Sequence, residues 1–167
     1  IIGLHDTGNL KIGDTLTEGA SFNYTGIPTF SPEIFKVVIN LDPMKSKQLN
    51  KGLQQLCEEG VAQLFTRDID GKSMVGTVGV LQFDVIQHRL ENEYMATCRF
   101  DNLSYTKACW ITSESPTVLE DFIRRRKGQI AKDKDERTVF LTETRWSLER
   151  EINEHPDITF HTSAEIQ

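Results

Sequence analysis

The chain has 167 residues, with 19 lysines and arginines against 25 aspartates and glutamates, which gives a formal net charge of −6. This length suits one domain, or one domain with part of another, and it allows a buried core without disulfides or metals. No run approaches the roughly 18 apolar residues of a membrane-spanning helix, and no segment has a signal-peptide pattern. Cys57, Cys98 and Cys109 are too few and too dispersed for a disulfide framework, which predicts a cytoplasmic protein.

The first 34 residues are rich in glycine and threonine. Turn signals at residues 6–9 and 13–14 separate short apolar runs, a pattern typical of β-hairpins. Residues 23–32 contain three turn-forming glycine and proline residues, which predicts a linker. These strands are too few to close a barrel, and the chain begins at Ile1 rather than Met. We therefore expect residues 1–34 to be the end of a β-barrel domain and a linker, cut from a longer protein.

The pattern of apolar and turn-forming residues changes at residue 35. Residues 35–40 predict a strand, and Asp42-Pro43 then predicts a helix start, because Asp caps free backbone N–H groups and Pro suits the first helical position. Leucines 49, 53 and 56 form a one-sided apolar stripe along the predicted helix 44–59, and Gly60 ends it. Strands are predicted at residues 62–66 and 73–78, joined by a turn at residues 70–71.

A second helix is predicted over residues 80–94, with Leu81, Phe83, Val85, Ile86 and Leu90 facing the core, and a strand over residues 95–100. The order so far is βαββαβ, a ferredoxin-like unit.

Further elements follow this unit. A strand is predicted at residues 106–112, a helix at 116–130, a strand at 138–142, a helix at 146–154 and a strand at 158–161. No internal sequence repeat is apparent. The expected fold class is α/β (α+β), with the ferredoxin-like unit extended by these strands and helices and preceded by the last strands of a barrel. The apolar faces of helices 44–59, 80–94 and 116–130 are expected to pack on the sheet.

Two segments match phosphate-binding loops only in part. Gly71-Lys72-Ser73 has the tail of GxxxxGK[ST], but the first glycine is replaced by Thr66, and residues 68–70 suit a hairpin turn. Residues 76–79 lack the GxGxxG spacing and are better explained by close backbone approach at a helix start. The sequence therefore predicts no nucleotide site in this chain.

Other catalytic and metal-binding patterns are also missing. No histidine or cysteine has metal-ligand spacing, and Asp84 and His88, one helical turn apart, are interpreted as a surface pair. Cys98 and Cys109 are predicted on neighbouring strands as buried small hydrophobes. The predicted strand 73–78 has no aromatic residue for base stacking, which disfavours an RNA-recognition domain. We expect no catalytic residue, metal ligand or cofactor in this chain.

Basic residues are concentrated in two places. Residues 124–137 contain seven lysines and arginines against three acidic residues, whereas residues 143–165 have a net charge of −4. A smaller stripe lies on the exposed side of the first predicted helix. Both groups fit either solvated helix faces or contacts to RNA phosphates. The candidate contact residues are Lys45, Lys47, Lys51, Arg124, Arg125, Arg126 and Lys127.

Several stretches resemble the translational GTPases. Residues 12–16 (Ile-Gly-Asp-Thr-Leu) resemble the end of their barrel domain, and residues 42–60 resemble the first helix of the next domain. Residues 78–85 (Val-Gly-Val-Leu-Gln-Phe-Asp-Val) resemble its second helix, where elongation factor G usually has Gly-Glu-Leu-His-Leu-Asp. This form, together with residues 22–32, resembles the class II peptide-chain release factors, the release factor three family. One departure is Cys109, where we expect Arg before Trp110.

The resemblance implies a ribosome-bound GTPase that removes class I release factors after peptide release. GTP and Mg²⁺ would be bound by an N-terminal domain absent from this chain, so the chain itself is not expected to be an enzyme. The implied partners are small-subunit RNA and protein of the ribosome, the parent's own GTPase domain and, indirectly, class I release factors, with no DNA or membrane. Residues 35–167 would form the release-factor C-terminal domain.

Two alternatives remain open from the sequence. One is a ferredoxin-like regulatory domain that binds a small molecule, which requires a deep pocket with convergent polar groups. The other is the corresponding fragment of an elongation factor G paralogue, which the helix motif at residues 78–85 disfavours.

Overall fold

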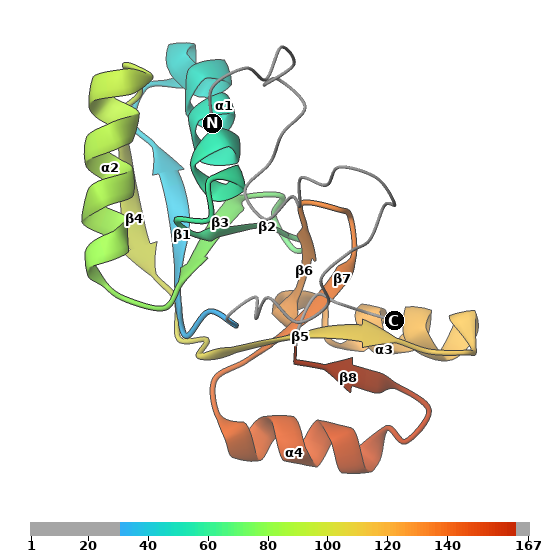
Figure 1. The fold of residues 1–167 in the computed structure, drawn as a ribbon. Helices are drawn as coiled ribbons and strands as arrows, with labels where there is room; N and C mark the ends of the chain where they lie inside the picture. Colours follow the sequence, from blue (N-terminus) through green and yellow to red (C-terminus); the bar gives the residue numbers. More distant parts are fainter. Residues whose placement is uncertain (1–30, 163–167) are drawn as a thin grey trace, which may run out of the picture.

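The computed structural model describes residues 31–162, so the predicted hairpins of residues 1–30 lie outside the described part of the chain (Figure 1). The described residues form four α-helices and one eight-stranded sheet in which every pairing is antiparallel. None of these four helices is long and apolar enough to cross a membrane.

In chain order the elements are β1 (Ile34–Asn40), the 3-10 turn η2 (Pro43–Lys45), α1 (Ser46–Glu58), β2 (Gln63–Arg67), β3 (Ser73–Thr77), α2 (Leu81–Glu93), β4 (Cys98–Asn102), β5 (Lys107–Thr112), α3 (Pro116–Arg125), the 3-10 turn η3 (Lys127–Gln129), β6 (Ile130–Asp133), β7 (Thr138–Thr142), α4 (Arg145–Glu154) and β8 (Thr159–His161).

The sheet consists of two units with the same topology. Its strand order is β4-β1-β3-β2-β6-β7-β5-β8. The first unit, from β1 to β4, has the βαββαβ order and the 4-1-3-2 strand arrangement of a ferredoxin-like fold, as predicted. The second unit, from β5 to β8, repeats both the order and the arrangement, although no repeat is apparent in the sequence. The second strands of the two units, β2 and β6, pair with each other and make the sheet continuous.

The starts of α2 and α4 show the same repeat in their hydrogen bonds. Residues 77–82 and 142–147 each begin with a threonine. The hydroxyl of Thr77 donates to the backbone oxygen of Gly79 at 3.0 Å, and the hydroxyl of Thr142 donates to the backbone oxygen of Thr144 at 3.3 Å. The backbone N–H of Gly79 donates to the side-chain oxygen of Gln82 at 3.0 Å, and that of Thr144 donates to the side-chain oxygen of Ser147 at 3.3 Å. Both segments thereby satisfy backbone groups that a helix N-terminus leaves unpaired.

The sheet is strongly bent, so that its helix-free faces pack on each other. The rings of Phe65 on β2 and Trp110 on β5 have centroids 6.4 Å apart. In a flat sheet, β6 and β7 would separate these strands by roughly 14 Å, because neighbouring strands lie ~4.8 Å apart. The result is an inner core shared by both units: Phe35, Phe65, Met74, Ala108, Trp110, Ala131, Val139 and Leu141.

Helices cover the two outer faces (Figure 1). Leu49, Leu53 and Leu56 of α1 and the buried face of α2 pack on the first unit, while Phe122 of α3 packs on the second. Strand residues alternate between layers: in β7, Val139 belongs to the inner core and Phe140 to the α3 core. The fold is therefore a helix–sheet–sheet–helix arrangement with three apolar layers.

The start and end signals predicted for the first helix are confirmed. The side chain of Asp42 accepts a 3.0 Å hydrogen bond from the backbone N–H of Met44, with Pro43 at the first position of η2. Gly60 follows α1 with a φ of +81°, a conformation that favours glycine. Inside α1, Gly52 allows close contact with α2, because a Cβ there would lie 2.6 Å from Leu90.

The predicted helix over residues 116–130 is wrong in its second half. α3 ends at Arg125, and Ile130 begins strand β6, which pairs with β7 through Ile130–Phe140 and Ala131–Val139. Ile130 lies seven residues after Ile123, so it mimics a helical stripe. The four residues of β6 are covered on both faces of the sheet, which hides the alternation that marks a half-buried strand.

Two further expectations need correction. Leu81 and Val85 are 73% and 49% exposed, so only Phe83, Ile86 and Leu90 form the buried face of α2. Cys98 and Cys109 are both buried as predicted, but β4 lies at one edge of the sheet and β5 next to the other. These cysteines are therefore not on neighbouring strands.

Candidate functional site

The seven candidate contact residues do not form one surface. Lys45, Lys47 and Lys51, here called the α1 lysines, lie on η2 and α1 over the first unit. Arg124, Arg125, Arg126 and Lys127, here called the α3 cations, lie at the end of α3 and on η3 over the second unit (Figure 1). Because the inner core separates the two outer layers, the two groups must be assessed separately.

The α3 cations have different surroundings. Arg124 is exposed and pairs with Asp121, with 2.5 Å between its Nη2 and Oδ1 of the carboxylate. Arg126 is half-buried and pairs with Glu151 of α4 at 2.8 Å, so it supports the packing of α3 against α4. Arg125 and Lys127 are exposed and have no ion pair to any described residue. These two are the α3 cations best placed to contact a partner.

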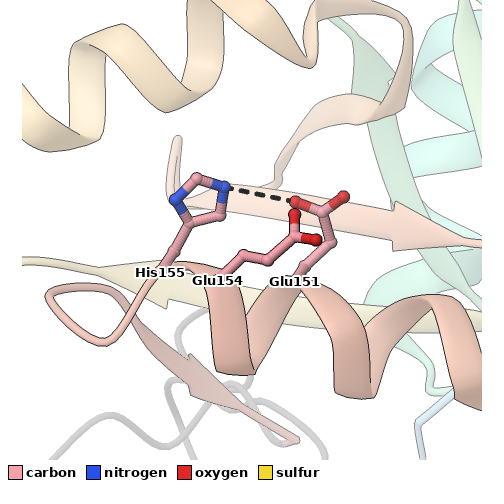
Figure 2. A group of neighbouring side chains, drawn as sticks. All are labelled: Glu151, Glu154 and His155. Atoms are coloured by element: carbon pink, nitrogen blue, oxygen red, sulfur yellow. Dashed lines mark ion pairs between the residues drawn. The ribbon is translucent and has the colours of Figure 1, made fainter.

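Glu151 is the most buried charged side chain near this cluster, with 7% of it exposed. Its Oε1 accepts hydrogen bonds from Nε and Nη2 of Arg126 at 3.1 and 2.8 Å. Its Oε2 has no hydrogen-bond partner in the described structure and lies 3.5 Å from Nε2 of His155 (Figure 2). The ring of His155 packs edge-on against Phe122, with 5.0 Å between centroids. This network fastens the end of α4 to α3.

Glu151, Glu154 and His155 each offer one atom within 4.8 Å of the others, as a metal site requires (Figure 2). Their charges, however, are already balanced. Arg126 holds Glu151, and Arg150 lies 3.7 Å from Glu151 and 3.5 Å from Glu154. A dication would be repelled by both guanidinium groups at short range. The arrangement is that of an ion-pair network that joins two helices.

A hollow beside this network bears on the small-molecule alternative. It has a volume of about 150 Å³ and is lined by Val118, Asp121, Phe122, Arg125 and His155. Sites for small organic ligands usually enclose ~300–1,000 Å³. This hollow is therefore too small for such a ligand.

Near Lys45, the structure exposes three apolar side chains that the sequence analysis did not single out. Nζ of Lys45 donates a 3.0 Å hydrogen bond to the backbone oxygen of Met95, which follows α2. Leu41, Met44 and Met95 are 55%, 89% and 66% exposed. Leu41 and Met44 lie in the link between β1 and α1, and Met95 lies between α2 and β4, so no helical or strand periodicity could have predicted their exposure.

Lys47 and Lys51 differ from Lys45 in their surroundings. They stand four residues apart on α1, so they share one face of the helix. Both are exposed and have no ion pair to a described residue. Lys45, by contrast, is half-buried and engaged with Met95. Of the α1 lysines, Lys47 and Lys51 are therefore the freest to meet an outside partner.

Exposed apolar side chains also stand at the starts of α2 and α4. Leu81 and Trp146 occupy the same position in the two repeated segments and are 73% and 68% exposed. The guanidinium carbon of Arg150 lies 5.7 Å from the Trp146 ring centroid. Val78 and Val80 extend the exposed apolar area beside Leu81.

The cysteines are placed for packing rather than chemistry. Burial raises the pKa of the Cys57 thiol to about 12. Burial likewise raises the pKa of Cys98 and Cys109 to about 11. A thiol with such a pKa is almost wholly protonated near neutral pH and is a poor nucleophile. Cys109 is 3% exposed, so the position before Trp110 contributes no surface charge.

The fold is that of a mixed α/β domain built from two ferredoxin-like units. A family model described as "Class II release factor RF3, C-terminal domain" matches residues 24–151, which cover every element from β1 to β7 and most of α4. The chain belongs to this family, and its role is that of a release-factor C-terminal domain in translation termination.

Proposed function

We propose that this chain is the ribosome-contacting and interdomain-coupling part of a GTP-dependent termination factor that promotes dissociation of class I release factors. In this proposal GTP and Mg²⁺ are bound by a GTPase domain outside the chain, and the chain itself is not catalytic and acts in the cytoplasm. The observation that carries the proposal is the family match over residues 24–151.

The surface charges support a ribosome contact. Lys47 and Lys51 on the first unit, and Arg125 and Lys127 on the second, are exposed cations without ion pairs to described residues. Cations that are not already paired can bind RNA phosphates or protein carboxylates without first giving up another partner. The contacts are proposed to be to small-subunit RNA and protein.

The fold also suits mechanical coupling. The two units share one sheet and one inner core, so a push on one helical layer is transmitted to the other through close-packed side chains. The GTPase domain would shift this rigid body between two states that differ in their ribosome contacts.

The proposal is tested with the full-length factor that carries this chain. The measurement is the rate at which a fluorescent class I release factor leaves termination complexes, recorded by stopped flow, together with GTP hydrolysis. We expect the double variant Lys47→Glu, Lys51→Glu to slow dissociation at least about tenfold, because charges at an interface control association. The Lys72→Glu variant, on the β2–β3 turn, is the matched control and should match the wild type. A second double variant, Arg125→Glu, Lys127→Glu, is measured in the same way. The proposal would be contradicted if both double variants dissociated the class I factor at the wild-type rate.

A further inference from the structure

The solvent-facing side of α1 has an unusual composition for a chain with a net charge of −6. From Ser46 to Cys57 the helix contains no aspartate or glutamate, and Glu58 is its first carboxylate. The exposed side chains before Glu58, apart from Ser46, are two lysines and four amides. They are Lys47, Gln48, Asn50, Lys51, Gln54 and Gln55. This side of the helix can therefore donate and accept hydrogen bonds without presenting negative charge before its last residue.

Helical spacing brings these side chains onto one surface. Lys51 follows Lys47 by four residues, and Gln54 and Gln55 follow Lys51 by three and four. Side chains at this spacing have Cβ atoms roughly 5–6 Å apart. The leucines of α1 point the other way, into the outer core of the first unit. Neither the lysines nor the amides have an ion pair or a side-chain hydrogen bond to a residue that the structure describes.

The acidic residues of the neighbouring helix α2 are either paired or turned away from this surface. Arg89 of α2 holds both Glu93 and Glu59, the residue that follows α1. Burial and then the charge of Glu91 raise the pKa of the Cys98 thiol on β4, so Glu91 lies toward β4. Because α2 packs over β4 and α1 over β2, at the other edge of the first unit, this side of α2 faces away from α1.

The charges at the two ends of α1 set the limits of the surface. The C-terminal end of α2 carries partial negative charge beside the start of α1 (Figure 1), but there Lys45 donates a 3.0 Å hydrogen bond to the backbone oxygen of Met95. The carboxylate of Asp42 is engaged in capping η2. At the other end, Glu58 and Glu59 are exposed. The positive surface is therefore the part of α1 that precedes Glu58.

The chemistry of this surface matches RNA better than protein. Unpaired lysines bind phosphates without first giving up another partner. Amide groups both donate and accept hydrogen bonds, as do the 2′-hydroxyls of ribose. No large apolar side chain of α1 is exposed, whereas the centre of a protein–protein contact is enriched in apolar and aromatic side chains. The exposed Met44 stands on η2, before the surface begins.

We infer that α1 lies against the minor groove of an RNA double helix, with Lys47 and Lys51 on phosphates and the amides on ribose hydroxyls. Single-stranded RNA is bound largely by stacking of its bases on aromatic rings or arginines, and α1 contains neither. In an RNA duplex the major groove is too deep and narrow for side chains to read, whereas the minor groove is wide and shallow. The inference rests on the proposed function and deepens it by naming the partner at the α1 lysines.

Photo-crosslinking identifies the partner class. The full-length factor with Gln54→Cys is labelled with an azidophenyl maleimide, bound to ribosomal termination complexes and irradiated. Lys72→Cys is the control position, and the unsubstituted factor reports any labelling of its own cysteines. We expect an adduct between residue 54 and ribosomal RNA that primer extension maps to a base-paired segment, and none from residue 72. An adduct to a ribosomal protein, an adduct to an unpaired nucleotide, or no adduct from residue 54 would overturn the inference.

An affinity measurement provides the second readout. The double variant Asn50→Ala, Gln54→Ala removes two amides, keeps the charge and favours the helix. We expect it to bind the complexes at least about fivefold more weakly, as the loss of two hydrogen bonds implies, with an unchanged salt slope. In contrast, Lys47→Ala, Lys51→Ala should reduce the slope of log affinity against log salt by about two, one for each phosphate. Asn153→Ala, exposed on α4, is the control and should bind like the wild type.

The outcomes separate the inference from the proposed function. Wild-type affinity in the amide double variant would overturn the inference and leave the proposed ribosome contact standing. Absence of binding by the unaltered factor would overturn the proposed function and, with it, the inference.

Discussion

The indole Nε1 of Trp110 donates a 2.7 Å hydrogen bond to Oδ2 of Asp133, and so joins β5 to β6 across the strand β7 that lies between them. Asp133 is 7% exposed and also accepts from Nε of Arg137 at 2.8 Å. The backbone N–H groups of Asp135 and Arg137 both donate to its Oδ1 at 2.9 Å. One carboxylate therefore closes the β6–β7 turn and anchors the inner core.

The first prediction concerns the stability that Asp133 supplies. The variant Asp133→Asn loses the negative charge to which Trp110, Asp135 and Arg137 donate, and it leaves Arg137 with a weaker partner. We expect a loss of about 2–3 kcal/mol in the free energy of unfolding, measured by urea denaturation. Asp135→Asn removes an exposed partner of Arg137 and should change stability by less than about 0.5 kcal/mol. Equal losses in the two variants would contradict this role.

The second prediction concerns acid unfolding. Burial alone would raise the pKa of the Asp133 carboxyl, but hydrogen bonds from Trp110, Arg137 and Asp135, with the charge of Arg137, hold that pKa below its ordinary value of 3.8. Such a carboxyl contributes stability above its unfolded pKa and loses it as the pH falls through its folded pKa. The wild type should therefore lose more stability than Asp133→Asn below about pH 4, as measured by urea denaturation at several pH values. If the unfolding free energies of the two proteins fell in parallel with pH, Asp133 would not be the source of the acid sensitivity.

The third prediction separates two neighbouring arginines. Arg126→Ala leaves the buried Glu151 without its hydrogen-bond donors, and we expect a loss of about 3 kcal/mol. Arg125→Ala removes an exposed side chain and should cost less than about 0.5 kcal/mol. Thermal unfolding of both variants measures the difference. If Arg126→Ala were as stable as the wild type, the ion pair between Arg126 and Glu151 would not fasten α4 to α3.

The fourth prediction concerns the cysteines. Because burial raises the pKa of Cys57, Cys98 and Cys109, the folded protein should react with a disulfide reagent near pH 8 at least about a hundredfold more slowly than free cysteine. All three thiols should react at ordinary rates in denaturant. Rapid labelling of any one of them in the folded protein would contradict its placement.

The fifth prediction concerns Met95. Replacing it with Asn places a residue that tolerates a φ of +53° at the end of α2. We expect Met95→Asn to raise stability by about 1 kcal/mol, the order of strain expected for a left-handed residue, measured by chemical denaturation. A loss of stability would mean that Met95 packs against the fold rather than facing solvent.

The sequence predicts most of the first unit because each of its elements carries several consistent signals. Asp42 and Pro43 start the 3-10 turn η2 that leads into α1, Gly60 follows the end of α1, and the leucines of α1 have helical spacing. The exposure of Leu81 and Val85 could not be predicted, since apolar residues on two sides of a helix look alike without knowledge of which side meets the sheet.

The second unit was predicted less well for a physical reason. Strands β5, β6 and β7 are largely covered on both faces, so consecutive residues such as Ile130 and Ala131 are both buried and show no alternation. The second unit repeats the topology of the first and the hydrogen bonds at the start of its second helix. The residues at matching positions mostly differ, so the repeat is not visible in the sequence. The seven candidate contacts stay a prediction, and the sequence could not show that Arg126 is tied to Glu151 while Arg125 has no ion pair to a described residue.

The most direct test of the proposed ribosome contact is the affinity of the full-length factor for purified ribosomes, measured by co-sedimentation at increasing salt. We expect binding that weakens with salt, and a smaller slope of log affinity against log salt in the double variants Lys47→Glu, Lys51→Glu and Arg125→Glu, Lys127→Glu. Lys72→Glu should leave that slope unchanged. Slopes and affinities equal to those of the wild type in both double variants would contradict the account.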